Sequence, residues 1–393
     1  MIINGHFDKL KLKDRVINVK YIDEVDIQNK KVLLRLDLNV PIENGVISDT
    51  TRIEKSLKTI KFLLDCNNSL IILSHLGRIK LREDKINNSL KVVADKLSQL
   101  LGRTVAFIDN PVGMEVLNKC KDLKPKEIVM LENVRFCDYP EKLESSNDEN
   151  LAKYWSALGD VFVCDAFGSL HRLHSSVAGI SKFIPSYFGL LVKEEMEGLS
   201  KIIEPEHPYD LFMGGAKVDD KLPYIEELLP NIDFLLIGGG IANSFLYALG
   251  YDVGDSLYTK DEEILNKLKE LVEKYREKII LPIDFVFDGT SILDLGLKSI
   301  TKYKNVLGMC KTIFVNGTCG KFEVERFAKG TVDLFSYLRE IDAYKVAGGG
   351  DTLNVIHKYG LENCFNFLSS GGGASLEYVS SKKLTAIDYI NKG

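Results

Sequence analysis

The sequence has no long apolar run, no closely spaced cysteine pair and no large excess of charge of one sign. Its most apolar stretch, residues 234–250, is interrupted by consecutive glycines and by Asn243 and Ser244, so it does not predict a membrane span. The N-terminus, MIINGHFDKLKLKDRV, lacks the continuous apolar core of a secretory signal. A net charge of −5 over 393 residues gives no general attraction to nucleic acid or anionic membranes. We therefore expect a cytoplasmic protein with neither nucleic-acid nor membrane partners.

Several common motifs are also missing. The sequence contains no GxxxxGK[ST] loop and no GxGxxG after a predicted strand, which argues against the usual NTPase and dinucleotide-binding sites. Its seven cysteines form no CxxC pair, and several lie in apolar runs, which favours buried free thiols over disulfides. His171 and His174, in HRLH, could suggest zinc, but no third ligand follows at a recognised spacing.

Apolar strand-like runs alternate with helical periodicity along the whole chain. Such alternation is typical of a parallel sheet covered by helices on both faces, and the length exceeds that of one hydrophobic core. We therefore predict an α/β fold with two doubly wound parallel-sheet (Rossmann-like) domains. The predicted strands are 32–38, 69–74, 127–131, 160–164, 209–213, 232–237, 278–287, 311–315, 343–347 and 364–368. Residues 183–205 contain a long amphipathic helix, which we take as the domain connector, and SNDEN (146–150) is interpreted as a solvated loop.

The loops after the strands of the first half are rich in arginine. Ligands bind beyond the carboxyl ends of parallel strands, where these loops gather. Arginine presents a planar fork that matches phosphate or carboxylate oxygens two at a time. The first half therefore predicts a site for a small, multiply charged anion. Its candidate residues are Asp37, Asn39, Arg52, His75, Arg78, Arg135 and Arg172.

The corresponding loops of the second half are rich in glycine. They read GGAKVDDK (214–221), GGGIAN (238–243), NGTCGKFE (316–323), GGGDT (348–352) and SSGGG (369–373). Glycine costs about 0.5–1 kcal/mol inside regular structure, so repeated clusters need a reason. One reason is a tight turn; the other is that phosphate oxygens can approach bare backbone amides at helix N-termini. Four of these loops contain consecutive glycines, one cluster being followed by Lys217 and one by Asp351 and Thr352, so we favour the binding of nucleotide phosphates.

These loops, in this order, resemble those of the phosphoglycerate kinase family. LDLNVP (36–41) is similar to the family's RVDFNVP, and SHLGR, ENVRF, DAFGSLHRLHSS, GGAKVDDK, GGGDT and GGGASLE follow at the family's intervals. The resemblance extends from about Tyr21 to Lys383. It implies reversible phosphoryl transfer between 1,3-bisphosphoglycerate plus ADP and 3-phosphoglycerate plus ATP, with Mg²⁺, in a monomer that bends at a hinge.

The resemblance also implies a division of the chain and of its site residues. Residues 1–188, including an N-terminal extension of about 20 residues, would form the acceptor domain. Residues 189–204 would form the interdomain helix and 205–380 the nucleotide domain, with 381–393 returning to the first domain. Substrate would be bound by Asp37, Asn39, Arg52, His75, Leu76, Gly77, Arg78, Arg135 and Arg172. Nucleotide would be bound by Gly215, Lys217, Gly238, Gly239, Asn316, Glu323, Gly349, Gly350, Asp351 and Thr352, with Asp351 on the metal–nucleotide complex.

The catalytic groups implied by the resemblance are Arg52, Lys217, Lys221, Gly350 and Gly373. The family's WNGPMGVFE stands here as VNGTCGKFE, with Val315, Thr318, Cys319 and Lys321 at the changed positions, so we expect an altered nucleotide pocket. Two other functions stay open at this stage. One is a non-catalytic binding protein of the same fold, and the other is an unrelated two-domain dehydrogenase, against which the missing dinucleotide fingerprint argues.

Overall fold

The computed structural model describes residues 10–391 except 13–14 and 18, so most of the expected N-terminal extension lies outside the described residues. Its described part is a hairpin of β1 (Leu10–Leu12) and β2 (Arg15–Ile17). The chain divides into two compact units. Unit 1 comprises residues 1–196 and 383–393, and unit 2 comprises residues 197–382. The division falls within helix α6 (Leu190–Ile203).

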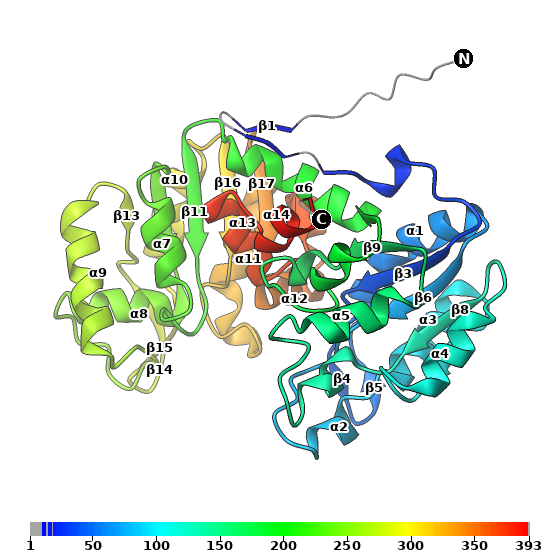
Figure 1. The fold of residues 1–393 in the computed structure, drawn as a ribbon. Coiled ribbons are helices and arrows are strands. Elements are labelled where there is room, and N and C mark those ends of the chain that lie inside the picture. Colours follow the sequence, from blue (N-terminus) through cyan, green and yellow to red (C-terminus); the bar gives the residue numbers. More distant parts are fainter. Residues whose placement is uncertain (1–9, 13–14, 18, 392–393) are drawn as a thin grey trace. The chain divides into compact units, whose positions relative to one another are not determined.

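Unit 1 is built on a sheet of six parallel strands in the order β10-β9-β3-β6-β8-β7 (Figure 1). Their bounds are β3 (Lys31–Leu36), β6 (Ser69–Leu73), β7 (Ala106–Ile108), β8 (Ile128–Leu131), β9 (Val161–Asp165) and β10 (Ser186–Phe188). The helices are α1 (Thr51–Asp65), α2 (Asp84–Asn87), α3 (Lys91–Leu101), α4 (Met114–Lys121), α5 (Glu149–Ser156) and α14 (Thr385–Ile390), and β4 (Ile42–Glu43) pairs with β5 (Val46–Ile47). The predicted strands β3, β6, β8 and β9 are confirmed. The outer strands β7 and β10 are too short to give a sequence signal.

Both faces of this sheet are buried, which explains why its strands read as continuous apolar runs. On one face Val32 and Leu34 share a core with Ile60 of α1 and Val93 of α3. Leu33, which points to the other face, is also fully buried. A central parallel strand therefore lacks the alternation of apolar and polar residues by which a half-exposed strand is recognised in a sequence.

Unit 2 repeats the plan with six parallel strands in the order β13-β12-β11-β16-β17-β18 (Figure 1). The strands are β11 (Tyr209–Met213), β12 (Phe234–Ile237), β13 (Ile279–Ile280), β16 (Thr312–Asn316), β17 (Tyr344–Gly348) and β18 (Phe367–Ser369). The helices are α7 (Leu222–Leu228), α8 (Gly239–Ala248), α9 (Glu262–Lys274), α10 (Leu297–Leu307), α11 (Lys329–Tyr337), α12 (Gly350–Lys358) and α13 (Gly373–Ser381). The prediction of two α/β units with parallel sheets is confirmed.

Two sequence predictions in unit 2 were wrong in detail. Residues 278–287 were expected to form one strand, but they form β13 and, after Pro282, β14 (Phe285–Asp288), which pairs antiparallel with β15 (Ser291–Leu295). Proline lacks the N–H that a strand interior needs, so the run breaks there. Residues 364–368 were also expected to be strand, but a 3₁₀ turn over Glu362–Cys364 delays β18 to Phe367.

The structure also tests the predictions made for the cysteines and for the SNDEN segment. All seven cysteines are free, five of them buried and two half-buried. The SNDEN segment is not simply a solvated loop, because Asp148 caps α5 by accepting from the Leu151 amide. Within the described ranges, no helix combines the length and apolar character that crossing a membrane requires.

Strand β11 contains a buried acidic residue, Asp210, whose burial lowers the stability of the folded protein. Asp210 is fully buried, and among the described residues its carboxyl oxygens have only a contact with the Leu236 amide that falls short of a full hydrogen bond. Burial raises its pKa well above the usual value, and the nearby Leu236 amide lowers it only in part. The folded protein therefore holds a proton that the unfolded chain releases above about pH 4. This carboxyl reduces stability increasingly as the pH rises through that value.

We predict that Asp210→Val raises the free energy of unfolding at pH 7 by about 1–3 kcal/mol, because it removes an unsatisfied buried polar group. Asp210→Asn should remove the pH-dependent part of the penalty while leaving a polar group buried. Urea unfolding of both variants at pH 4 and pH 7 measures these effects, with exposed Asp288→Asn as the control. A less stable Asp210→Val protein would show that Asp210 has a partner that stabilises it.

Candidate active site

The charged side chains predicted for the first half gather at one edge of the unit 1 sheet. Asp37 follows β3, His75 follows β6, Arg135 follows β8, and Arg172 lies in the loop after β9. Parallel strands place all four carboxyl ends at the same edge. The structure therefore brings together loops that are far apart in sequence.

An ion pair between Arg52 and Asp37 lies at the centre of this group. Arg52 is the second residue of α1, and its Nη1 lies 2.5 Å from Oδ2 of Asp37. Burial alone would raise the Asp37 pKa, but the charge and hydrogen bond of Arg52 are the main opposing cause, and with smaller contributions from its other neighbours the pKa is lowered to about 2. Asp37 is therefore an ionised hydrogen-bond acceptor at neutral pH. Its Oδ1 is buried and has no hydrogen-bond partner in the described part of the chain, which leaves one acceptor atom for a ligand.

Hydrogen bonds between side chains and backbone groups tie the neighbouring loops together. The Gly77 amide donates to Oδ1 of Asn39 at 2.9 Å, and Nη1 of Arg135 donates to the Gly77 carbonyl. Asn133 donates to the carbonyl of Leu76, whose side chain is buried. Gly77 has a φ of +60°, and a Cβ there would collide with Asn88. Leu76, Gly77 and Asn39 thus set the loop geometry around the arginines.

Arg78 and Arg172 complete the cluster at its exposed rim. Burial lowers the pKa of Arg135, and Arg35 and Arg172 lower it further, so the guanidinium groups of Arg35 and Arg172 lie within electrostatic range of Arg135. Two buried acids, Asp37 and Glu144, interact electrostatically with these guanidinium groups. An excess of guanidinium groups over carboxylates suits a small, multiply charged anion.

Several residues of this site were not predicted from the sequence. Arg35 is buried within β3, and His171 and His174 were considered only as metal ligands. Burial first, and then the neighbouring arginines, lower the pKa of His171 to about 4 and that of His174 to about 3. Both histidines are therefore neutral at pH 7, and the arginines carry the positive charge of the site.

Unit 2 contains a cavity of about 410 Å³ beyond the carboxyl ends of its strands. This volume is ordinary for a site that holds a small molecule or cofactor. Gly215, Gly239, Glu323 and Asp351, all expected to bind nucleotide, line it. The changed residues Thr318, Cys319 and Lys321 line it as well, so the substitutions do lie at the pocket.

The glycines of unit 2 are of two kinds. The first kind allows neighbouring loops to touch, because a Cβ at Gly214 would collide with the Thr318 carbonyl and one at Gly240 with the Ala216 carbonyl. Gly238 and Gly239 are also in close backbone contact with their neighbours. These glycines therefore serve close contact between neighbouring loops, a reason that neither of the two sequence-based explanations included.

Glycines of the second kind border open space. A Cβ at Gly350 or Gly373 would have no atom within 4 Å. Both residues are exposed and begin helices, α12 and α13, where backbone N–H groups lack partners within the helix. These two helix starts can accept anionic oxygens close to the main chain.

The polar side chains expected to contact nucleotide differ in exposure. Lys217 is exposed, whereas Nζ of Lys221 donates to the Gly214 carbonyl at 2.7 Å and the Asn316 carbonyl at 3.2 Å. Burial lowers the Lys221 pKa to about 8 although Asp351 raises it. Thr352 is buried, and its Oγ1 accepts from the Gly317 amide at 2.7 Å. Lys221, Asn316 and Thr352 therefore hold the loops together.

Asp351 is the residue best placed to meet a metal ion bound to nucleotide. It is exposed, lies in the first turn of α12 and lines the cavity. Residues 10–391, apart from the gaps at 13–14 and 18, contain no cluster of three or more His, Cys, Asp or Glu side chains arranged to hold a metal. Mg²⁺ usually binds through one or two carboxylates together with substrate phosphates, so a single carboxylate fits this ion.

Comparisons with known proteins agree with this geometry. The family model described as phosphoglycerate kinase matches residues 22–382. A phosphoglycerate kinase of Mesomycoplasma hyopneumoniae is 42% identical, covering 95% of this chain and 98% of its own, and one of Mycoplasma genitalium is 43% identical, covering 96% and 100%.

Solved structures give the same result. The phosphoglycerate kinase of Coxiella burnetii superposes with a TM-score of 0.79 at 34% identity, covering 95% of this chain and 98% of its own. The enzyme of Pyrococcus horikoshii gives 0.84 at 29% identity with the same coverage. The match spans both parallel-sheet units, the arginine cluster of the first and the glycine loops of the second. The chain belongs to the phosphoglycerate kinase family.

Proposed function

We infer that the chain catalyses the reaction of its family, the reversible transfer of a phosphoryl group between 1,3-bisphosphoglycerate plus ADP and 3-phosphoglycerate plus ATP. Unit 1 binds the glycerate substrate and unit 2 binds the nucleotide. The observation that carries this assignment is the separation of two kinds of site. Guanidinium groups gather in unit 1, whereas in unit 2 the glycine-rich loops after the strands, together with Asp351 in the first turn of α12, line a cavity.

In the acceptor site, Arg78, Arg135 and Arg172 bind the phosphate that is not transferred. Asp37 and Asn39 bind the hydroxyl and carboxyl end of the glycerate, where Oδ1 of Asp37 accepts a hydrogen bond from the hydroxyl group. The ion pair with Asp37 holds Arg52 in position before substrate arrives. Arg52 then stabilises the phosphoryl group during transfer, since a group fixed in advance does not have to reorganise.

In the nucleotide site, the amides of Gly350 and Gly373 and the Lys217 ammonium bind the phosphates. Gly215, Gly238, Gly239 and Gly349 shape the backbone around them, and Glu323 lies toward the ribose. Lys221, Asn316 and Thr352 act one step away by positioning the loops. This assignment changes the expected role of Lys221 from direct catalytic contact to support with a fixed positive charge.

Mg²⁺, held through Asp351 and the nucleotide phosphates, would neutralise phosphate charge when bound. The protein's own contribution is positioning and fixed positive charge, because the phosphoryl transition state spreads negative charge over its equatorial oxygens. An acyl phosphate is a good phosphoryl donor, so the reaction needs no strong general base. We further propose that the protein acts as a cytoplasmic monomer.

An assay of ATP formation from 1,3-bisphosphoglycerate and ADP, coupled to a nucleotide-dependent indicator enzyme, tests the activity. Parallel runs with ADP and GDP show whether the altered pocket changes the base preference. Turnover at rates ordinary for an enzyme is expected. Binding of both ligands without turnover would instead identify a non-catalytic binding protein.

We predict opposite effects for two glycine substitutions. Gly350→Ala should leave stability nearly unchanged but raise the KM for ATP about tenfold or more, because its Cβ enters the space over the helix start. Gly214→Ala should lower the melting temperature, because its Cβ collides with the Thr318 carbonyl. Melting curves and initial rates of both variants measure this. Normal ATP kinetics for Gly350→Ala would argue against backbone binding of phosphate there.

Lys217→Ala should lower kcat by about 10²-fold or more, as expected for a transition-state donor. The affinity for 3-phosphoglycerate should stay near wild type, since Lys217 belongs to unit 2. Exposed Lys269 of α9 provides the control, and Lys269→Ala should have normal kinetics. Near-normal turnover by Lys217→Ala would remove this residue from the mechanism.

Transfer requires the two ligands to come into bonding distance, so we propose that the units approach each other when both ligands are bound. Excluding water from the closed form would protect the acyl phosphate and strengthen the electrostatic interactions. Small-angle scattering should show a smaller radius of gyration with 3-phosphoglycerate and a non-hydrolysable ATP analogue together than with either alone. An unchanged radius with both would count against closure.

A further inference from the structure

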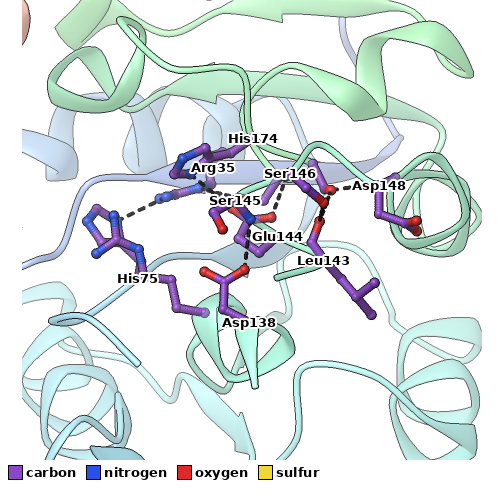
Figure 2. Close-up of polar contacts among 12 residues, drawn as sticks. Arg35, His75, Asp138, Leu143, Glu144, Ser145, Ser146, Asp148 and His174 are labelled. Atoms are coloured by element: carbon purple, nitrogen blue, oxygen red, sulfur yellow. Dashed lines mark hydrogen bonds and ion pairs between the residues drawn. The ribbon is translucent and has the colours of Figure 1, made fainter. Parts of the chain in front are cut away.

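Arg35 is a buried cation whose hydrogen bonds run in two directions. It lies in β3 at 1% exposure, between His75 on one side and the Glu144 loop on the other (Figure 2). Its Nη2 is 3.0 Å from Nδ1 of His75, and its Nε donates to Oγ of Ser176 at 2.9 Å. Its Nη1 donates to the carbonyl of Leu36. The guanidinium plane is therefore fixed at three points.

Glu144 anchors the far end of this chain of contacts. Its side chain is fully buried, Oε1 accepts from the Ser176 hydroxyl at 2.5 Å, and Oε2 accepts from the Ser176 amide at 3.0 Å. Because the hydroxyl proton of Ser176 points to Glu144, the oxygen is free to accept from Arg35. Ser176 thus links the carboxylate to the guanidinium group.

This arrangement determines where His75 carries its proton. Arginine has only donors and stays protonated, so Nδ1 of His75 must be the acceptor in their hydrogen bond. The ring is then the neutral tautomer with its proton on Nε2. Burial lowers the His75 pKa well below its usual value, and Arg35, Arg135 and Arg52 lower it further against the raising effect of Asp37, which agrees with a neutral ring.

We propose that Glu144 and Ser176 are positioning residues that hold Arg35 against His75, so that His75 presents a single neutral Nε2–H donor to an oxygen of the glycerate substrate. This proposal rests on the proposed function, which places that substrate in unit 1. It explains why a carboxylate is buried behind an anion site, since Glu144 offsets the charge of Arg35. His174 does not replace Arg35 as the cation beside Glu144. It is neutral at pH 7, and its Nδ1 lies 3.8 Å from Oε1 of Glu144.

Ser176→Ala is the sharpest test, because it breaks the link without removing a charge. We expect the KM for 3-phosphoglycerate to rise about 5- to 20-fold, in line with the loss of a hydrogen bond to a charged group, while the KM for ATP is unchanged. In ¹⁵N-labelled protein without ligand, the His75 imidazole should change from one tautomer to a mixture. Ser176→Thr, which keeps the hydroxyl, should restore both the tautomer and the KM.

Ser175→Ala is the matched control. The Ser175 hydroxyl donates to the carbonyls of Leu143 and Asp148 in the same loop and touches neither Arg35 nor His75. Its loss should lower stability without changing the His75 tautomer. Glu144→Gln supplies a second variant, and it should shift the tautomer in the same direction as Ser176→Ala.

The outcomes separate the two hypotheses. A single Nε2–H tautomer in Ser176→Ala and Glu144→Gln, or equal effects of Ser175→Ala and Ser176→Ala, would overturn the positioning role. Because the NMR measurement needs no substrate, it tests this role even if the wild-type protein fails to form ATP. Such a failure would count against the proposed function alone.

Discussion

Parallel pairing of the strands is the constraint on which the site depends. In each unit, loops that are far apart in sequence meet because the strands before them run in one direction. Both faces of each sheet are used for packing, so the edge where the strands end is the place left for polar chemistry. The two units share this plan and use it for different purposes, arginines in one and bare helix starts in the other.

In unit 1, the fold brings several arginines close together, and buried acidic residues offset part of their mutual repulsion. Asp37 pairs with Arg52 near the surface of the site, and Glu144 offsets Arg35 behind it. The histidines contribute hydrogen-bond geometry without charge, since burial and the arginines keep them neutral at pH 7. The site is therefore strongly positive toward a ligand although its interior charges are largely compensated.

Much of this could be predicted from the sequence. The central strands are apolar runs, and the loops after them contain charge or glycine in a recognisable order. Arg35 was missed because it interrupts an apolar strand, where a charged side chain gives no sign of its partners. Glu144 lies in a polar loop that looks solvated, and only the fold brings it beside Ser176. The glycines were interpreted too uniformly, because sequence does not distinguish close backbone contact at Gly214 from open space at Gly350.

The central claim is that the two ligands bind to different units through different chemistry. Backbone amide spectra of the whole protein, recorded with 3-phosphoglycerate alone and with Mg-ATP alone, test it most directly. The account predicts that 3-phosphoglycerate shifts amides around Asn39, Gly77 and Arg135, and that Mg-ATP shifts those of Gly350 and Gly373. Direct shifts from both ligands within the same unit would contradict it.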